Sequence, residues 1–212
     1  MKILNSLKKL PIDLGQAEMK EKTKGKFIAF SFVPNVDKGK ALDVGCRDGY
    51  WSEKLMKKGY DVESIDVDPR YSPAKKIDVN EGFPYKNESF NLIWCSEVLE
   101  HLKDPEQVLI QMSKLLKKDG IIVATVPNSH FWLMKIFYLT GLTPRKMQNS
   151  GHLHFFTKAS FKNILPSHEH IYGYFPYAIL KFKIKWLIGF LSPTFVAVIT
   201  KQQYSETNPE IK

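Results

Sequence analysis

Cysteine is scarce in this 212-residue sequence, and long uninterrupted apolar segments are missing. The two cysteines, Cys46 and Cys95, are too few for a disulfide framework or a cysteine-rich metal site, which indicates a reducing compartment. The most apolar region, residues 171–200, is interrupted by three lysines, so no continuous membrane span is predicted. The opening residues, MKILNSLKKLPIDLG, lack the apolar centre of a signal peptide. Together these absences predict a cytoplasmic protein.

The chain does have a large apolar fraction and an excess of positive charge. A hydrophobic content of 43% is enough for one well-buried core, so a single domain over residues 1–212 is predicted. The formal net charge of +9 is compatible with nucleic acid, an anionic membrane surface or a phosphorylated substrate, and does not choose among them. The lysines look dispersed, and a solvated surface accounts for that pattern.

Short apolar runs alternate with helix-like segments. Strands are predicted at ALDVG, DVESIDV, AKKIDV, FNLIWCS, IIVATVP and residues 195–200. Helices are predicted over residues 15–32, 50–58, 105–118, 131–142 and 157–165, with Asp119 and Gly120 ending the third. Because this alternation is typical of a parallel sheet with crossover helices, the predicted fold class is α/β.

Glycines and acids follow three successive strands. Gly45 and Gly49 follow ALDVG, where glycine lets a ligand approach the backbone closely, although a plain strand-to-helix turn is the structural alternative. Asp66 ends the second strand, where an acid can accept hydrogen bonds from both hydroxyls of a ribose. Its alternative is a helix cap, which Asp68 could serve equally well. Asp78 follows the third strand, where its side chain or the neighbouring backbone could meet an adenine amino group. A solvated acid in a turn is the structural alternative. Ligands of open α/β sheets bind at the carboxyl ends of the strands, so these residues are expected to lie together.

The segments ALDVGCRDG, SIDVDP, KIDVNEGFPYKNESFNLIWCSEVLEHLKDP and GIIVATVPN, in this order, resemble the class I S-adenosylmethionine-dependent methyltransferases. The resemblance covers about residues 40–128. It implies a Rossmann-like sheet of seven strands, mostly parallel with an antiparallel last strand, and helices on both faces. It also implies S-adenosylmethionine as cofactor and S-adenosylhomocysteine as product. A dinucleotide site is disfavoured, because the loop GCRDG lacks the GxGxxG spacing.

The resemblance also implies cofactor contacts at particular positions. The loop after the first strand would wrap the methionine part, the acid after the second would hold the ribose, and apolar neighbours would contact the adenine. Residues after the fourth strand would border the methionine end. The expected cofactor-binding residues are Asp43, Gly45, Cys46, Gly49, Asp66, Val67, Asp78, Val79, Cys95 and Ser96. The domain then divides into an N-terminal helical segment (1–39), a cofactor-binding core (40–128), a substrate or lid region (129–192), the last strand (193–203) and a polar tail (204–212).

Arg47 stands where the family often has glycine. A side chain at this position disfavours a positive φ and places a guanidinium group near the cofactor loop. That group either points to solvent or binds a carboxylate or phosphate. Cofactor binding is still expected, because Gly45 and Gly49 remain.

Three residues are predicted to be catalytic: His101, His154 and Glu97. Methyl transfer depends mainly on alignment of the nucleophile, and a base helps when the acceptor is a hydroxyl. Glu97 and His101, four residues apart, can share a helical face, with a helix start capped by Ser96 as the alternative. In an extended HLHFFT segment His152 and His154 lie on the same side, with structural hydrogen bonding as the alternative. No third close ligand can be placed from the sequence, so no metal site is predicted.

The aromatic and lysine-rich region after Asn128 is expected to set substrate choice. The run VPNSHFWLMKIFYLTGLTP followed by HLHFFT resembles methyltransferases of glycan and lipid modification and, more distantly, the methionine-biosynthesis protein W family. The predicted function is methylation of a small molecule at oxygen, on a sugar or lipid-linked intermediate, with peripheral membrane contact through lysines flanking Trp and Phe. An accessory binding protein without methyl transfer is the alternative. RNA methylation ranks lower, because CSEV replaces the expected Pro-Pro-aromatic motif and no RNA-binding domain is appended, so nucleic acid is not the expected partner.

Overall fold

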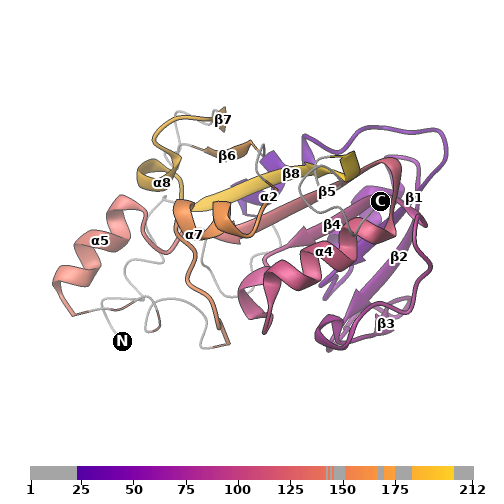
Figure 1. Cartoon of the computed structure of the whole chain (residues 1–212), viewed down its shortest axis with the longest axis horizontal. Coiled ribbons are helices and arrows are strands. Elements are labelled where there is room, and N and C mark those ends of the chain that lie inside the picture. The colour runs from indigo at the N-terminus through magenta and orange to yellow at the C-terminus, as the bar shows by residue number, and fades with distance from the viewer. Residues whose placement is uncertain are drawn as a thin grey trace.

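A computed structural model describes residues 23–141, 143, 145, 151–166, 170–174 and 183–202. Its centre is an eight-stranded sheet in the order β3-β2-β1-β4-β5-β8-β6-β7 (Figure 1). Strands β1 to β5 run parallel, and β8 runs antiparallel between β5 and β6. The predicted Rossmann-like sheet with an antiparallel last strand is therefore confirmed. The strands are β1 Gly39–Val44, β2 Tyr60–Asp66, β3 Lys75–Lys76, β4 Phe90–Ser96, β5 Leu116–Pro127, β6 Ile171–Tyr174, β7 Lys183–Ile184 and β8 Thr194–Thr200.

The described sheet has one strand more than the seven predicted. The sequence located neither β6 nor β7. The strand beyond the seven is β7, which has two residues and pairs antiparallel with β6 at Gly173 and Tyr174. A strand of two residues has no periodicity to distinguish it from a loop, so the sequence could not reveal it. The first five strands and β8 all lie within runs that the sequence predicted as strands or directly beside them.

Helices cover both faces of the sheet, as predicted. On one face α4 packs Val108, Leu109 and Met112 into the larger apolar cluster, which also contains Phe161 of α7. The opposite face carries α2 and α3, whose apolar residues belong to a second cluster around Trp51. The helices are α2 Lys24–Phe30, α3 Tyr50–Met56, α4 Pro105–Leu115, α5 Trp132–Leu139, α7 Lys158–Asn163 and α8 Ile188–Leu191, with short 3-10 turns η1 Val79–Glu81 and η2 Leu99–His101. None of the helices within the described residues is long and apolar enough to cross a bilayer.

The C-terminal end of α4 differs from the prediction. The helix ends at Leu115, and Leu116 already belongs to β5, where it pairs with Phe90. The next paired residues are Leu92 and Ile121, so residues 117–120 form an irregularity in the ladder. The expected stop at Asp119 and Gly120 was wrong, because pairing with a distant strand takes over before the local turn signal is reached.

The other helix bounds differ in smaller ways. The helices predicted over residues 131–142 and 157–165 are shorter, as α5 and α7. Thr157 begins α7 with a capping box, accepting a hydrogen bond from the Ser160 amide while the Ser160 hydroxyl accepts one from the Thr157 amide. The predicted helix over residues 15–32 is seen as α2, and its part before residue 23 lies outside the described residues.

Gly59 connects α3 to β2 in a conformation that excludes other residues. Its φ is 95°, and a Cβ there would overlap the backbone carbonyl of Val36. Gly141 has a similar φ of 79°, but no atom lies within 4 Å of its Cβ position. We expect Gly59→Ala to lower the free energy of unfolding by about 3 kcal/mol or more, and Gly141→Ala by only about 1 kcal/mol. Urea unfolding of both variants tests this, and equal losses would contradict the role of the Val36 overlap.

Candidate functional site

The carboxyl ends of β1, β2 and β4 meet at one edge of the sheet. Val44, the last residue of β1, is aligned with Ile65 of β2 on one side and with Cys95 of β4 on the other. The segments that follow these strands are therefore neighbours, as expected of a ligand site in an open α/β sheet.

The loop after β1, residues 45–49, is wound through three left-handed positions. The φ values of Gly45, Arg47 and Gly49 are 75°, 47° and 78°. A Cβ at Gly45 would overlap Val98, and one at Gly49 would overlap the ring of Tyr71. Arg47 therefore adopts a positive φ, the conformation that is unfavourable for a residue other than glycine.

The guanidinium group of Arg47 lies beside a carboxylate of its own loop. Its Nε lies 3.7 Å from Oδ2 of Asp48, and the side chain is 43% exposed. The backbone of Arg47, by contrast, is held firmly, because its carbonyl accepts hydrogen bonds from the amides of Arg70 and Tyr71. The side chain therefore combines the two alternatives, since it is exposed to solvent and lies beside the Asp48 carboxylate.

Asp66, at the end of β2, fits the expected role of a ribose ligand. Its Oδ2 accepts a hydrogen bond from the Arg47 amide at 3.0 Å, and its Oδ1 accepts one from the Asp68 amide at 2.8 Å. A carboxylate offers about four acceptor sites, so about two remain for the two hydroxyls of a ribose. Val67 beside it is 60% exposed and presents apolar surface at the same strand end. This donor and acceptor set fits S-adenosylmethionine.

Asp78 and Val79 have local structural roles. Asp78 caps η1, since its Oδ1 accepts hydrogen bonds from the amide and the side-chain nitrogen of Asn80 at 2.9 and 2.8 Å. Val79 is 6% exposed and belongs to the apolar core. Their expected contact with the adenine stays a prediction.

Asp43 lies in a buried hydrogen-bond chain. Its carboxylate accepts a bond of 2.6 Å from the Ser52 hydroxyl of α3, and Ser52 in turn accepts one of 2.8 Å from Ser64 of β2. Burial raises the pKa of Asp43 to about 7, although the Ser52 hydrogen bond opposes the shift. This network joins the two strands and the helix that frame the loop.

The raised pKa of Asp43 predicts a pH-dependent stability. The native state holds this proton up to about pH 7, whereas the unfolded chain loses it near pH 4, so the contribution of Asp43 to stability falls as the pH rises through this window. An asparagine at position 43 can still accept the Ser52 hydrogen bond and carries no charge. We expect the stability of Asp43→Asn relative to wild type to increase by up to about 4 kcal/mol between pH 4 and pH 8. Denaturant unfolding at both pH values measures it, and a pH-independent difference would contradict this pKa.

The two cysteines are buried neutral thiols. Cys46 is 7% exposed and Cys95 is fully buried. Burial raises the pKa of Cys46 to about 12 and raises that of Cys95 as well, so neither forms the thiolate that a nucleophile requires. The Ser96 hydroxyl forms a hydrogen bond of 2.8 Å with the Thr125 hydroxyl. It does not cap a helix, which was the alternative role considered for this residue.

Glu97 immediately follows β4 in a left-handed conformation with a φ of 57°. Its Oε2 forms an ion pair of 3.3 Å with Lys26 of α2. The expectation that Glu97 and His101 share a helical face was wrong, because only the short turn η2 forms here and Val98 precedes it. Lys26 is a partner that the sequence did not predict.

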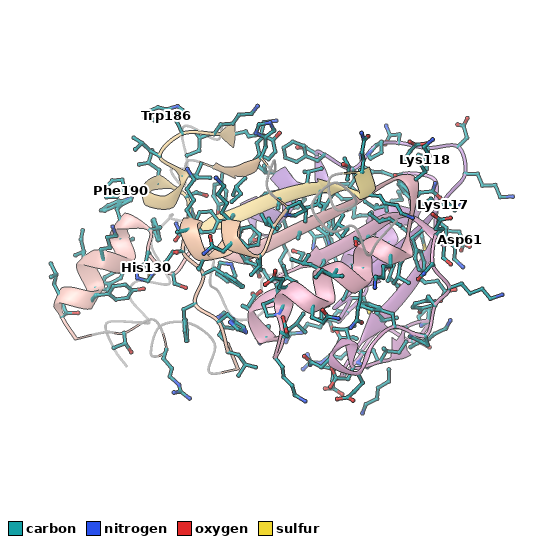
Figure 2. All side chains as sticks on the ribbon, in the orientation of Figure 1. Asp61, Lys117, Lys118, His130, Trp186 and Phe190 are labelled. Atoms are coloured by element: carbon teal, nitrogen blue, oxygen red, sulfur yellow. The ribbon has the colours of Figure 1, made fainter. Side chains whose placement is uncertain are left out.

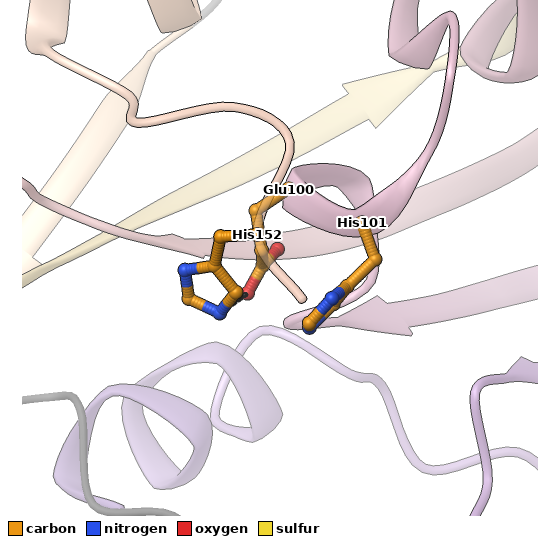
Figure 3. A group of neighbouring side chains, drawn as sticks. All are labelled: Glu100, His101 and His152. Atoms are coloured by element: carbon orange, nitrogen blue, oxygen red, sulfur yellow. Dashed lines mark ion pairs between the residues drawn. The ribbon is translucent and has the colours of Figure 1, made fainter. Parts of the chain in front are cut away.

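Glu100, His101 and His152 form a close cluster of ionisable groups, which we call the Glu–His–His cluster. Figure 3 shows the two imidazole rings on either side of the Glu100 carboxyl group. One ligand atom from each residue lies within 4.8 Å of the others. The backbone carbonyl of Glu100 accepts hydrogen bonds from the amides of Leu153 and His154, which brings His152 to η2.

The Glu100 carboxyl group is buried without a full set of polar partners. Glu100 is 1% exposed, and neither of its carboxyl oxygens has a hydrogen-bond partner among the described residues. Nε2 of His152 lies 4.0 Å from Oε1. Burial, reinforced by Glu97, raises the pKa of Glu100 well above its ordinary value. Burial, together with His101, lowers the pKa of His152 to about 4. Both shifts favour the uncharged forms, the protonated carboxyl group of Glu100 and the neutral imidazole of His152.

The tautomer of His101 follows from its hydrogen bond. Its Nδ1 lies 3.0 Å from the carbonyl oxygen of Gly151, which can only accept, so Nδ1 carries the hydrogen. The lone pair is then on Nε2, available to accept a proton. The same cluster could hold a cation through one carboxylate oxygen and two imidazole nitrogens, once Glu100 loses its proton. Glu100 is the third close ligand that the sequence could not place.

His154 is not part of this cluster. Its Nε2 lies 2.9 Å from the carbonyl oxygen of Leu102, and its ring stacks on Phe156. It lines a separate surface cavity of about 360 Å³, together with Asp104 and Ser160. The expectation that His152 and His154 lie on the same side required a regular extended segment. In the structure this segment is irregular coil.

The strand order, the antiparallel β8 and the glycine loop facing Asp66 define a class I S-adenosylmethionine-dependent methyltransferase fold. A family model described as a methyltransferase domain matches residues 16–168. The chain therefore belongs to the methyltransferase domain family, and S-adenosylmethionine is its cofactor.

Among proteins of known name, the chain is similar to ubiquinone biosynthesis O-methyltransferases. It is 29% identical over 125 residues to that of Photorhabdus laumondii, covering 50% of this chain and 52% of the relative. It is 31% identical over 100 residues to that of Cereibacter sphaeroides, covering 41% and 40%. The chain thus spans about half the length of the curated relatives it matches.

Solved structures share the fold at low sequence identity. An S-adenosylmethionine-dependent methyltransferase of Thermotoga maritima has a TM-score of 0.62 at 15% identity, covering 82% of this chain and 85% of its own. One from Mesorhizobium loti has a TM-score of 0.61 at 14% identity, covering 81% and 94%. At these identities the similarity concerns the fold.

Proposed function

We propose that this protein transfers the methyl group of S-adenosylmethionine to a hydroxyl oxygen of a small-molecule acceptor, a sugar or a lipid-linked intermediate. The observation that carries this proposal is the Glu–His–His cluster, which follows β4 at the edge of the sheet where the cofactor loop lies. The O-methyltransferase names of the relatives support oxygen as the methylated atom.

The cofactor supplies an electrophilic methyl group when bound, and the chain supplies position and a base. Asp66 would hold the ribose through its free acceptor sites, and the loop between Gly45 and Gly49 would surround the methionine part. Alignment of the acceptor oxygen with the methyl group provides most of the rate enhancement.

His101 is the best placed of the three predicted catalytic residues to act as the base. Its Nε2 can accept the acceptor's proton, since Nδ1–H is committed to the Gly151 carbonyl. His152 would position this ring, because the His152 ring packs edge-on against it with a centroid distance of 4.6 Å. Glu97 is engaged with Lys26, and His154 with Leu102, which makes them weaker candidates.

Transfer of a labelled methyl group to defined acceptors tests this proposal. The purified chain is incubated with methyl-labelled S-adenosylmethionine and with hydroxylated sugars or prenyl-linked phenols, and each acceptor is paired with an analogue whose hydroxyl is already methylated. Label is expected in a hydroxylated acceptor, with none in its methylated partner. The proposal would be overturned if calorimetry showed that the cofactor binds but label were transferred only to RNA. Failure to bind the cofactor would favour the accessory-protein alternative.

A further inference from the structure

The positive charge of the chain is concentrated in its second half. Residues 120–205 contain nine lysines and arginines and a single acidic residue, Glu169. The lysines are dispersed along the whole sequence, as expected, but the acids that would balance them stop almost completely after Asp119. A region with this composition attracts anionic partners.

The same region exposes large apolar side chains on two neighbouring helices and on the turn that precedes the second of them. They are Ile136 and Leu139 on α5, Trp186 and Leu187 in the turn after β7, and Phe190 on α8; their exposed fractions are 48, 88, 66, 56 and 48%. We call these five residues the α5–α8 patch. Lys135 joins the two helices, because its Nζ lies 5.9 Å from the centre of the Phe190 ring. Figure 2 shows Trp186 and Phe190 together at one end of the molecule.

Lysines flank the patch. Lys183 and Lys185 lie on the chain just before Trp186, with their ammonium groups 5.2 and 5.3 Å from the ring centre of Tyr172. Leu187 adopts a left-handed φ of 49°, which is uncommon for residues other than glycine and carries a conformational cost. The turn that contains it exposes both Trp186 and Leu187. Exposed aromatic and aliphatic groups bordered by lysines are the composition of surfaces that lie in the headgroup region of a bilayer.

The helices α5 and α8 lie at the same edge of the sheet as the proposed methyl-transfer site. Pro127 at the end of β5 is paired with Thr194 at the start of β8, so α5, which follows β5, and α8, which precedes β8, are both at the carboxyl edge of the parallel strands. Figure 1 shows α5 and α8 at the end of the molecule opposite β2 and β3.

We propose that the α5–α8 patch docks the protein on a lipid bilayer with anionic headgroups. The lysines provide charge complementarity to the headgroups, and the apolar side chains enter the boundary with the acyl chains. This orientation turns the carboxyl edge of the sheet toward the membrane, where a lipid-linked acceptor would be located. Membrane docking itself does not depend on the proposed methyl acceptor.

Nucleic acid is the competing anionic partner, and the exposed side chains decide against it. Bases stack on aromatic rings, whereas three of the five patch residues are aliphatic. Leu139, the most exposed residue of the patch, gains nothing from a phosphate backbone but is stabilised by burial in hydrocarbon.

Co-sedimentation of the full chain with vesicles tests the docking surface. Vesicles of phosphatidylcholine alone are compared with vesicles containing phosphatidylglycerol. We expect binding only to the anionic vesicles, weakened by high salt, because the lysine contribution is screened. A triple variant with Lys135→Gln, Lys183→Gln and Lys185→Gln should bind at least tenfold more weakly. The matched control changes three exposed lysines elsewhere, Lys57→Gln, Lys86→Gln and Lys118→Gln, and should bind as wild type does.

The apolar contribution is tested separately. Leu139→Ser combined with Trp186→Ser should weaken vesicle binding at least tenfold, whereas Met56→Ser, an exposed apolar residue of α3, should not. Tryptophan fluorescence should shift to shorter wavelength on anionic vesicles, and Trp186→Phe should remove most of this shift. Equal losses in the lysine variant and its control would overturn the proposal. Binding to single-stranded RNA but not to vesicles would also overturn it.

Discussion

Replacement of Asp66 by alanine is expected to weaken S-adenosylmethionine binding by about 100-fold. The carboxylate would accept two hydrogen bonds from the ribose, and each bond to a charged acceptor contributes about 1.5 kcal/mol or more. The substitution also leaves the Arg47 amide without its acceptor, in a loop that already holds a non-glycine residue at a positive φ. Calorimetric titration with S-adenosylmethionine and with S-adenosylhomocysteine measures the change.

Two variants locate the cause of that loss. Asp66→Asn retains one acceptor oxygen and should fall between wild type and Asp66→Ala. Asp68→Ala removes a nearby exposed carboxylate but keeps the backbone amide that donates to Asp66, so cofactor affinity should stay within about twofold of wild type. Unchanged affinity in Asp66→Ala, with the chain folded by circular dichroism, would show that the ribose is held elsewhere.

The second large effect is expected for His101→Gln, which should lower kcat for a hydroxyl acceptor by about 100-fold. A positioned general base contributes about 10² to 10⁴ in rate, and glutamine can still donate a hydrogen bond to the Gly151 carbonyl without a basic nitrogen. Cofactor affinity should stay the same, because no cofactor contact is assigned to His101. Single-turnover kinetics and the Kd of the cofactor separate the two quantities.

His154→Gln is the matched control for this experiment. Its ring contacts the Leu102 carbonyl in a separate cavity, so kcat is expected to remain within about threefold of wild type. A large loss in His154→Gln and none in His101→Gln would reassign the base to the other histidine.

Much of the fold could be predicted because its signals are local. The apolar runs ending at Val44, Asp66 and Ser96 were recognised as strands, and the structure has them as β1, β2 and β4. The end of α4 was misplaced, because Leu116 leaves the helix for a ladder with Phe90, a residue 26 positions earlier that no local pattern reveals. The strand β7 was missed for the same reason, since its two residues are defined only by pairing.

The residues of the candidate site were likewise predictable only in part. Asp66 and the two loop glycines could be found from the sequence, because strand order and residue spacing alone place them at one edge of a parallel sheet. Glu100 and His152 could not be paired in advance, since 52 positions separate them and the irregular segment after Gly151 has no periodicity to follow. A long separation in sequence likewise concealed the ion pair between Lys26 and Glu97.

The sequence by itself thus determined the class of fold and the cofactor, because these depend on short motifs that follow consecutive strands. Only the tertiary structure decided that His101 and His152, and not His154, lie beside the buried Glu100, because burial and proximity arise when distant segments pack. It also decided that exposed apolar residues from α5 and α8 form one surface, since the antiparallel pairing of β8 with β5 brings the two helices to the same edge of the sheet.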